Sequence, residues 1–221
     1  MQHSPSGHAH ERRSSYQINR YPAAWIDVWH LRNGERLTLR PVLPQDGGLL
    51  GHMIEGLSRA TRHNRFHGAV NGLSADALTQ MSSVDYRRHL AFVITTVESE
   101  RERVVADARY AVDESGEGAE FALVVDDRWQ RKGLGERAMR ALSHAAHRQG
   151  LSWLHGCVLS ANAPMLSLMQ RCQFCCTPDR EDDHLVRVER SLAATSAKPS
   201  PTRSRSWFFR WLNAAPGAAR S

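Results

Sequence analysis

Short apolar or alternating stretches recur along the chain, and between them the apolar residues take up a helical spacing. The short stretches predict strands over 24–31, 35–42, 89–98, 102–112, 116–125, 152–160, 173–177 and 184–192. Apolar residues three or four positions apart predict helices over 44–58, 74–82, 134–149 and 162–172. Because helices stand between strands, this order predicts an α/β fold, of the α+β type, built on one mixed sheet.

Turn and capping residues mark several ends of these elements. Asn33 and Gly34 tolerate positive φ, so they predict a tight turn that joins the first two strands into an N-terminal hairpin. Ser74 is a suitable N-cap for the helix that follows it. Gly150 is placed to stop the long helix, and Pro164 stands where the first turn of the next helix needs no N–H.

Composition divides the chain into one domain with two tails. We expect residues 1–20 to be a disordered tail, 21–192 to be the folded domain, and 193–221 to be a basic, aromatic-containing low-complexity tail. The formal net charge is +6, but residues 1–20 have +2 and residues 195–221 have +5, which leaves −1 for the residues between them. The basic character thus belongs to the tails, and the domain is not expected to bind nucleic acid specifically.

The cellular setting follows from what the printed sequence lacks. No run of about 18 apolar residues predicts a membrane span, and the first residues do not resemble a secretory signal, so we expect a cytoplasmic protein. Cysteines in such a protein are expected to be free, buried thiols. Cys172 and Cys175 have the spacing of half a zinc site, but no second pair follows, so no metal is expected.

A polar, glycine-containing turn separates the strand over 116–125 from the helix over 134–149. The first N–H groups of a helix have no partners inside it, and with the helix dipole they favour an anion. Gly133 and Gly135 would let a phosphate approach the backbone, and Gln130, Arg131 and Lys132 would add donors and positive charge. The glycines could instead serve tight packing only, and their spacing alone does not decide between these interpretations.

Two familiar phosphate motifs do not fit this turn. Gly133, Gly135 and Ala138 have the spacing of a dinucleotide fingerprint, but the polar stretch 126–132 separates the strand from the first glycine. No acidic residue stands about 20 positions further on to hold a ribose. A Walker motif is excluded because no Gly-Lys-Ser/Thr is present.

The stretch "QRKGLG" resembles the Q/R-x-x-G-x-G/A signature of the GNAT superfamily of acetyltransferases, which binds the pyrophosphate of acetyl-CoA. The preceding "FALVV" strand and the later helix with "N-x-x-M" agree with it. The resemblance covers roughly residues 21–192 and is closest to the GNAT domain of bacterial protein lysine acetyltransferases, through "RLTLRPVLPQD", "SRATRHNRFHG" and "VDYRRHLAFV". It implies a GNAT-like acyl-CoA-binding fold with acetyl-CoA as cosubstrate.

The resemblance also implies a role for individual residues. Glu120 matches the family's catalytic glutamate, which takes a proton from the amine; its other interpretation is a strand residue facing solvent. A bulge in its strand would decide which face Glu120 takes. The backbone of Leu123 and Val125 is expected to pair with the pantetheine arm. The pyrophosphate is expected to lie on Gln130, Arg131, Lys132, Gly133, Leu134, Gly135 and Glu136. Asn162 matches a residue near the pantetheine, or it is only the N-cap of its helix.

Two positions depart from the family pattern. Many members have a tyrosine as general acid where this chain has Met169, which cannot donate a proton, and a glycine where it has Gln173. Arg59, Arg62 and Arg65 are expected to form a solvated face.

Three functions remain open from the sequence. The resemblance favours acetyl transfer to a primary amine on a protein lysine. The alternatives are acetylation of a small amine and a non-catalytic acyl-CoA-binding sensor, which Met169 favours and Glu120 opposes. The aromatic and basic residues of "SRSWFFRWLNAA" in the second tail are suited to contact with a membrane surface or a partner, or they stand in a disordered tail by chance.

Overall fold

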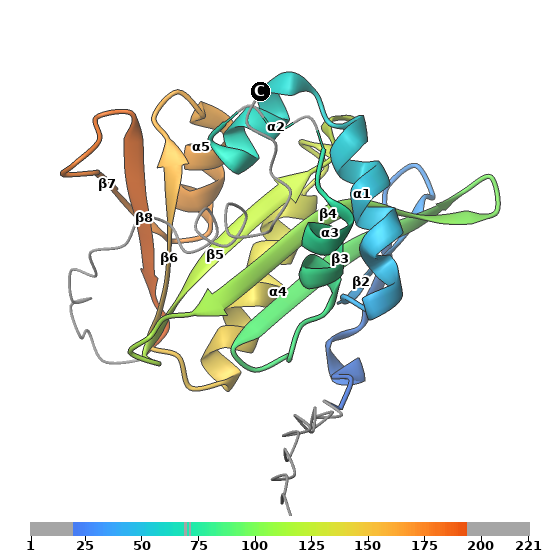
Figure 1. Ribbon diagram of the computed structural model, residues 1–221, viewed down its shortest axis with the longest axis horizontal. Helices are drawn as coiled ribbons and strands as arrows, with labels where there is room; N and C mark the ends of the chain where they lie inside the picture. Colours follow the sequence, from blue (N-terminus) through green and yellow to red (C-terminus); the bar gives the residue numbers. More distant parts are fainter. Residues whose placement is uncertain (1–19, 69, 71, 194–221) are drawn as a thin grey trace, which may run out of the picture.

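One mixed sheet forms the centre of the computed structural model, which describes residues 20–68, 70 and 72–193 (Figure 1). Its strands are β1 (Asp27–His30), β2 (Arg36–Pro41), β3 (His89–Glu98), β4 (Arg101–Val112), β5 (Gly118–Val125), β6 (Trp153–Leu159), β7 (Cys175–Pro178) and β8 (Leu185–Ser191). They lie in the order β1-β2-β3-β4-β5-β6-β8-β7. Neighbouring strands are antiparallel except β5 and β6, which are parallel. The predicted mixed sheet is confirmed.

Helices cover both faces of this sheet. They are α1 (Gly47–Gly56), α2 (Arg59–Phe66), α3 (Ala75–Ser82), α4 (Leu134–Arg148) and α5 (Ala163–Arg171). Short 3-10 turns occupy Ala23–Trp25, Pro44–Asp46 and Asp127–Trp129. The first three helices lie over one face of the sheet, and α4 and α5 lie behind the other (Figure 1). Each side of the sheet is thereby removed from water, which stabilises an otherwise half-exposed layer.

Two apolar clusters fill the space between the layers. On one face, Leu134, Met139 and Leu142 of α4 pack against Phe121 and Leu123 of β5. On the other face, side chains of α1, α2 and α3 pack against β3, β4 and β5; they include Leu50, Met53, Ile54, Phe66, Met81, Val93, Val104 and Val124. Residues of β5 alternate between the clusters, because successive side chains of a strand point to opposite faces.

Several local predictions are confirmed in the described residues. His30 pairs with Arg36 across the predicted hairpin, although only Gly34 of its turn has positive φ, at 85°. The Ser74 side chain caps α3 by accepting from the N–H of Ala77. Gly150 follows α4 with φ 81°. Helix α2 was not predicted; it begins after Ser58, whose side chain accepts from the Thr61 N–H.

The sequence prediction for the cysteines is only partly right. All four are free thiols, but Cys175 is exposed and only Cys172 is fully buried. Among the described residues, no group of three or more His, Cys, Asp or Glu side chains is arranged to hold a metal ion. In the same residues no helix is long and apolar enough to cross a membrane. The two predicted tails lie outside the described residues, apart from Arg20 and Ala193 at their boundaries.

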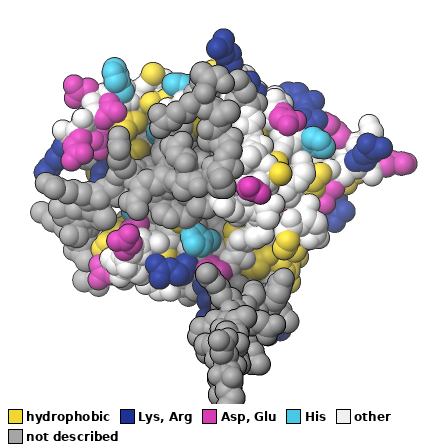
Figure 2. All heavy atoms as spheres, in the orientation of Figure 1, with side chains coloured by type: hydrophobic (Ala, Val, Ile, Leu, Met, Phe, Trp, Pro, Cys, Tyr) yellow, Lys and Arg dark blue, Asp and Glu magenta, His cyan; other side chains and the backbone are white. Residues whose placement is uncertain are grey.

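The surface of the described domain has no single sign of charge on the face in view. Figure 2 shows acidic and basic side chains interspersed there. Ion pairs occur across the described domain, for example between Arg103 and Glu98 at 2.9 Å and between Arg137 and Asp27 at 2.6 Å. This mixture agrees with the small net charge of the middle of the chain.

Candidate active site

Strands β5 and β6 pair over only three residues and then separate. Gly118, Ala119 and Glu120 are the register partners of Trp153, Leu154 and His155, and no later residue of β5 has a partner in β6. Strand β6 continues beside β8. A pocket of about 50 Å³ lies at this fork. It is lined by Asn64, Arg65, His67, Glu120, Phe121, Ala122, Leu123, Cys157, Val158, Asn162 and Met165. The separation of β5 from β6 thus leaves a pocket that a ligand can enter.

The backbone of β5 presents hydrogen-bonding groups to this opening. Asp126 donates its N–H to Val105, and Asp113 donates to Gly118, each over 2.9 Å. With the continuous β4–β5 register between them, these bonds show which residues face β4. In an antiparallel ladder every second residue directs its N–H and C=O away from the partner strand. Leu123 and Val125 therefore direct theirs toward the side where β6 has separated.

Glu120 stands at the point of separation. It shares a face of β5 with Ala122 and Val124, so its side chain lies on the side of α1, α2 and α3 and is 9% exposed. No register shift interrupts β5 from Ala119 to Val125. The only shift in the β3–β4 pairing falls between Ile94 and Thr95. The face of Glu120 is therefore set by plain strand alternation, without a bulge in its own strand.

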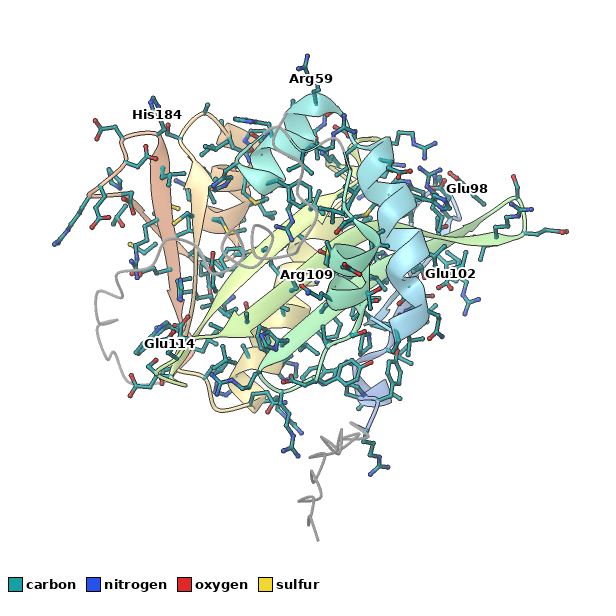
Figure 3. The ribbon with its side chains drawn as sticks, in the orientation of Figure 1. Arg59, Glu98, Glu102, Arg109, Glu114 and His184 are labelled. Atoms are coloured by element: carbon teal, nitrogen blue, oxygen red, sulfur yellow. The ribbon has the colours of Figure 1, made fainter. Side chains whose placement is uncertain are left out.

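Arg65 of α2 lines the same pocket, and the prediction of a solvated face is wrong for it. Its side chain is 3% exposed and its guanidinium lies 3.6 Å from the carboxylate of Asp107. Asp107 is fully buried and accepts from two nitrogens of Arg109, at 2.9 and 2.6 Å. Arg109 also donates to the backbone of Met81, between α3 and the sheet (Figure 3). Arg59, on a different face of α2, points to solvent (Figure 3).

These buried charges were missed by reasoning from the sequence, although a signal was present. Asp107 and Arg109 are two residues apart in 104–112, a part of β4 that is otherwise apolar. Residues at i and i+2 share one face of a strand, so opposite charges at that spacing indicate a buried pair. No comparable signal exists for Arg65, because its partner lies on a distant strand.

Titratable groups near Glu120 are held uncharged. Burial, together with the Glu120 charge, raises the pKa of the Cys157 thiol to about 11. Burial, together with the positive charges of Arg65 and His63, lowers the pKa of His67 to about 4. At neutral pH the pocket therefore contains a thiol and a neutral imidazole beside the glutamate.

His67 should make the fold less stable in mild acid. Between pH 6.5 and 4 the unfolded chain binds a proton at His67 that the folded chain does not, so the free energy of unfolding falls as pH falls. The loss at pH 5 should be at most about 2 kcal/mol, since the side chain is partly solvated. His67 has φ 48°, which asparagine tolerates, so His67→Asn should flatten the fall without straining the turn. Urea unfolding at pH 7 and pH 5 measures this fall in the free energy of unfolding. An equal fall in the wild-type protein and in His67→Asn would contradict the expectation.

The polar turn after β5 ends in a helix N-terminus. Arg131 has φ 60° and Gly133 has φ 86°, and α4 begins at Leu134 with no side-chain cap. A Cβ at Gly133 would meet nothing within 4 Å, whereas one at Gly135 would lie 2.9 Å from the Leu168 side chain. Gly133 is therefore needed for its backbone conformation, and Gly135 for close packing of α4 on α5. The first N–H groups of α4 remain available to an anion.

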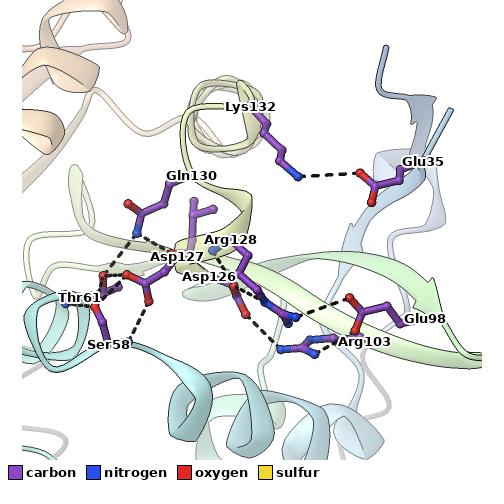
Figure 4. A network of polar contacts seen from close by, with 11 residues as sticks. Glu35, Ser58, Thr61, Glu98, Arg103, Asp126, Asp127, Arg128, Gln130 and Lys132 are labelled. Carbon is purple, nitrogen blue, oxygen red and sulfur yellow. Dashed lines mark hydrogen bonds and ion pairs between the residues drawn. The ribbon is translucent and has the colours of Figure 1, made fainter. Parts of the chain in front are cut away.

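Side chains of this turn are held by neighbouring elements. Lys132 lies over the Trp129 ring, 4.4 Å from its centroid, and 3.9 Å from Glu35 (Figure 4). Glu136 pairs with Arg140 at 2.5 Å. Gln130 donates to the Val125 carbonyl at 3.1 Å. The predicted phosphate residues are thus brought together around the start of α4.

Helix α5 and the turn after it contain three residues that the sequence singled out. The Asn162 side chain caps α5, by accepting from the Met165 N–H at 3.2 Å, and it also lines the pocket. Met169 is fully buried in the core. Gln173 takes the left-handed conformation, with φ 65°, so the turn is kept although a glycine is replaced.

Comparison with known proteins identifies the family. Residues 62–174 match the model of the acetyltransferase (GNAT) family. Acetyltransferase PA5475 of Pseudomonas aeruginosa is 31% identical over 169 residues, which are 76% of this chain and 89% of that protein. The chain therefore belongs to the GNAT family of acetyltransferases and is an N-acetyltransferase.

Solved structures agree on the fold. The GNAT domain of S. lividans PAT superposes with a TM-score of 0.69 at 23% identity, over 78% of this chain and 99% of that one. The Salmonella typhimurium protein yncA, whose structure contains its cofactor acetyl-CoA, superposes with a TM-score of 0.58 at 18% identity, over 73% of this chain and 96% of that one. At these identities the likeness concerns the fold, and the GNAT-like architecture predicted from the sequence is confirmed.

Proposed function

We propose that this protein transfers the acetyl group of acetyl-CoA to the side-chain amine of a protein lysine. The observation that carries the proposal is the position of Glu120, a buried carboxylate at the fork of β5 and β6, beside an open pocket. The acceptor preference rests on the resemblance to bacterial protein lysine acetyltransferases and on the likeness to the GNAT domain of S. lividans PAT. We further propose that the protein acts in the cytoplasm, where its cysteines would stay reduced.

Acetyl-CoA would lie along the fork. Its pantetheine amides can pair with the backbone groups of Leu123 and Val125, as an added strand would. Its pyrophosphate can accept from the first N–H groups of α4, where Gly133 leaves the approach open. Asn162 stands across the pocket and can contact the pantetheine while it caps α5.

Glu120 would act as the general base. A lysine ammonium cannot attack a thioester until it loses a proton, and the Glu120 carboxylate can take that proton directly or through water. The neutral amine nitrogen then bonds to the acetyl carbon, and the carbon–sulfur bond breaks with its electron pair going to sulfur. The thiolate of CoA leaves, and the nitrogen gives up its second proton to solvent to form the amide. A backbone N–H of β5 can donate to the carbonyl oxygen as charge develops there.

The departing thiolate needs no dedicated acid from this chain. Met169 stands where relatives have a tyrosine, and it is fully buried and carries no proton to give. A thiolate is stable enough in water to leave and take its proton from solvent afterwards. Cys157 is not suited to form an acyl-enzyme, because a thiol with a pKa of about 11 is a poor nucleophile at neutral pH. We therefore propose direct transfer from the thioester to the amine.

The experiment that tests this function uses labelled acetyl-CoA and a cell extract divided into protein and small-molecule fractions. Label in discrete proteins, lost with Glu120→Gln, supports protein lysine acetylation. Label only in small molecules would overturn the acceptor and favour a metabolite amine. No label in either fraction, with acetyl-CoA still bound, would overturn the enzyme and favour an acyl-CoA sensor.

A charged side chain at Gly133 should weaken acetyl-CoA binding. Gly133→Glu adds bulk and negative charge where the pyrophosphate would lie, so affinity measured by calorimetry should fall at least about tenfold. Gly116→Glu is the matched control, because Gly116 also has positive φ, 75°, and open space, but lies in the turn before β5. Equal affinities in the two variants would refute the phosphate site.

A further inference from the structure

A cluster of hydrogen bonds joins the start of α2 to the turn between β5 and α4. Asp127 of that turn accepts from the N–H of Ser58 at 2.8 Å, from the Ser58 hydroxyl at 2.8 Å and from the Thr61 hydroxyl at 2.6 Å. Gln130 donates from one nitrogen to the Thr61 hydroxyl at 3.3 Å and to the Val125 carbonyl at 3.1 Å. Figure 4 shows these contacts between α2 and the turn. We call this set, Ser58, Thr61, Asp127 and Gln130, the α2 clasp.

The α2 clasp joins the proposed phosphate-binding turn to the helix beside the pocket. On one side are Gln130 and the turn that leads into α4, where the pyrophosphate would bind. On the other side is α2, whose residues Asn64 and Arg65 line the pocket beside Glu120, as does His67 just after the helix. Helix α2 has only eight residues, which in isolation would not be stable in water. Its order therefore depends on the contacts that hold it.

The hydrogen bonds of the α2 clasp have a charged acceptor at the N-terminus of α2. Burial opposes the charge of Asp127, but the hydrogen bonds from Ser58 and Thr61 outweigh it and lower the pKa of this carboxyl below its ordinary value. A carboxylate at this end of α2 also interacts favourably with the helix dipole. Hydrogen bonds to a charged acceptor are stronger than neutral ones. Three hydrogen bonds to one charged acceptor thus join the turn to the start of α2.

We propose that Asp127 and Thr61 are positioning residues that couple acetyl-CoA binding to the order of α2, and that the part of the pocket lined by Asn64, Arg65 and His67 receives the acceptor and is thereby prepared for it. This inference rests on the proposed acetyl-CoA site. Binding of the pyrophosphate fixes the turn at Gln130, and the clasp extends that restraint to the helix that carries Arg65. Acetyl-CoA then favours acceptor binding without touching the acceptor residues, because part of the ordering entropy has already been lost.

Hydrogen–deuterium exchange of the whole protein, with and without saturating acetyl-CoA, tests the coupling. In the wild-type protein exchange should slow both at residues 130–136 and at residues 62–66, by about fivefold or more at α2. Thr61→Val keeps the shape of the side chain but removes the hydroxyl, so acetyl-CoA should slow exchange only at residues 130–136. Thr61→Ser restores a hydroxyl and should restore the effect on α2.

Thr79→Val is the matched control. Thr79 lies on α3, also eight residues long, and its hydroxyl donates only within that helix, to Ala75. This variant should behave as wild type. Slowing at residues 130–136 without slowing at α2 in the wild-type protein, or slowing at α2 that persists in Thr61→Val, would overturn the coupling alone. No slowing at residues 130–136 in any variant would overturn the acetyl-CoA site and the coupling with it.

Discussion

Replacing Glu120 with glutamine should lower the turnover number for acetyl transfer by about 10²- to 10⁴-fold, the usual contribution of a general base. The amide has the shape of the carboxylate but cannot take a proton from the attacking ammonium. Glu120 lies where β5 and β6 separate and is almost fully buried, so solvent bases should not easily replace it. The affinity for acetyl-CoA, measured by calorimetry, should stay within about twofold, because the proposed phosphate and pantetheine contacts are untouched.

Glu117→Gln provides the control for this experiment. Glu117 is an exposed residue just before the same strand and should tolerate the change with full turnover. Turnover of Glu120→Gln equal to that of Glu117→Gln would exclude Glu120 as the base. A rate that recovers as pH is raised is also expected, because alkaline solutions contain more of the neutral amine.

Replacing Asp107 with alanine should lower the free energy of unfolding by about 3–5 kcal/mol, as expected when one partner of a buried ion pair is removed. Asp107 lies between Arg65 and Arg109, which are both buried. The pKa of Arg65 is lowered to about 10, mainly by burial and also by the positive charge of Arg109. Without the carboxylate, two positive charges face each other under α2 and α3. Urea unfolding followed by circular dichroism measures the loss.

The control for Asp107 is an exposed ion pair of the same sheet. Glu98 and Arg103 lie 2.9 Å apart at the end of the β3–β4 hairpin, and 46% of the Glu98 side chain is exposed. Glu98→Ala should cost less than about 1 kcal/mol, because water and salt screen such pairs. If the two variants lose the same stability, Asp107 is not the buried counter-charge that the structure indicates.

The local pattern of the chain was sufficient for most elements of the fold. Strong periodicity predicted the strands and the long helix, and turn residues such as Gly34 and Gly150 predicted where elements end. Helix α2 was missed because its sequence, RATRHNRF, has few apolar residues. Its only buried side chains are Arg65 and Phe66, so packing against the sheet stabilises it where intrinsic pattern does not.

The residues of the candidate site also include some that the sequence predicted and others that it did not. Motif and resemblance named Glu120 and the residues from Gln130 to Glu136, because a strand, a polar turn and a helix start are local features. Arg65, His67 and Cys157 were not predicted as neighbours of Glu120, since they come from α2 and β6. Asp127 is more than 60 residues away from Ser58 and Thr61 in the sequence, and no local pattern predicts their contacts.

Local patterns in the sequence were enough to predict the mixed α/β fold, most of its elements and the glycine turn with its resemblance to the GNAT family. These follow from backbone preferences and hydrophobic periodicity, which act over a few residues. Three features could not be predicted from the sequence: the face that Glu120 takes, the burial of Arg65 against Asp107, and the contact of α2 with the turn before α4. These depend on strand register and on contacts between distant segments, because burial and charge pairing are fixed only when the layers pack together.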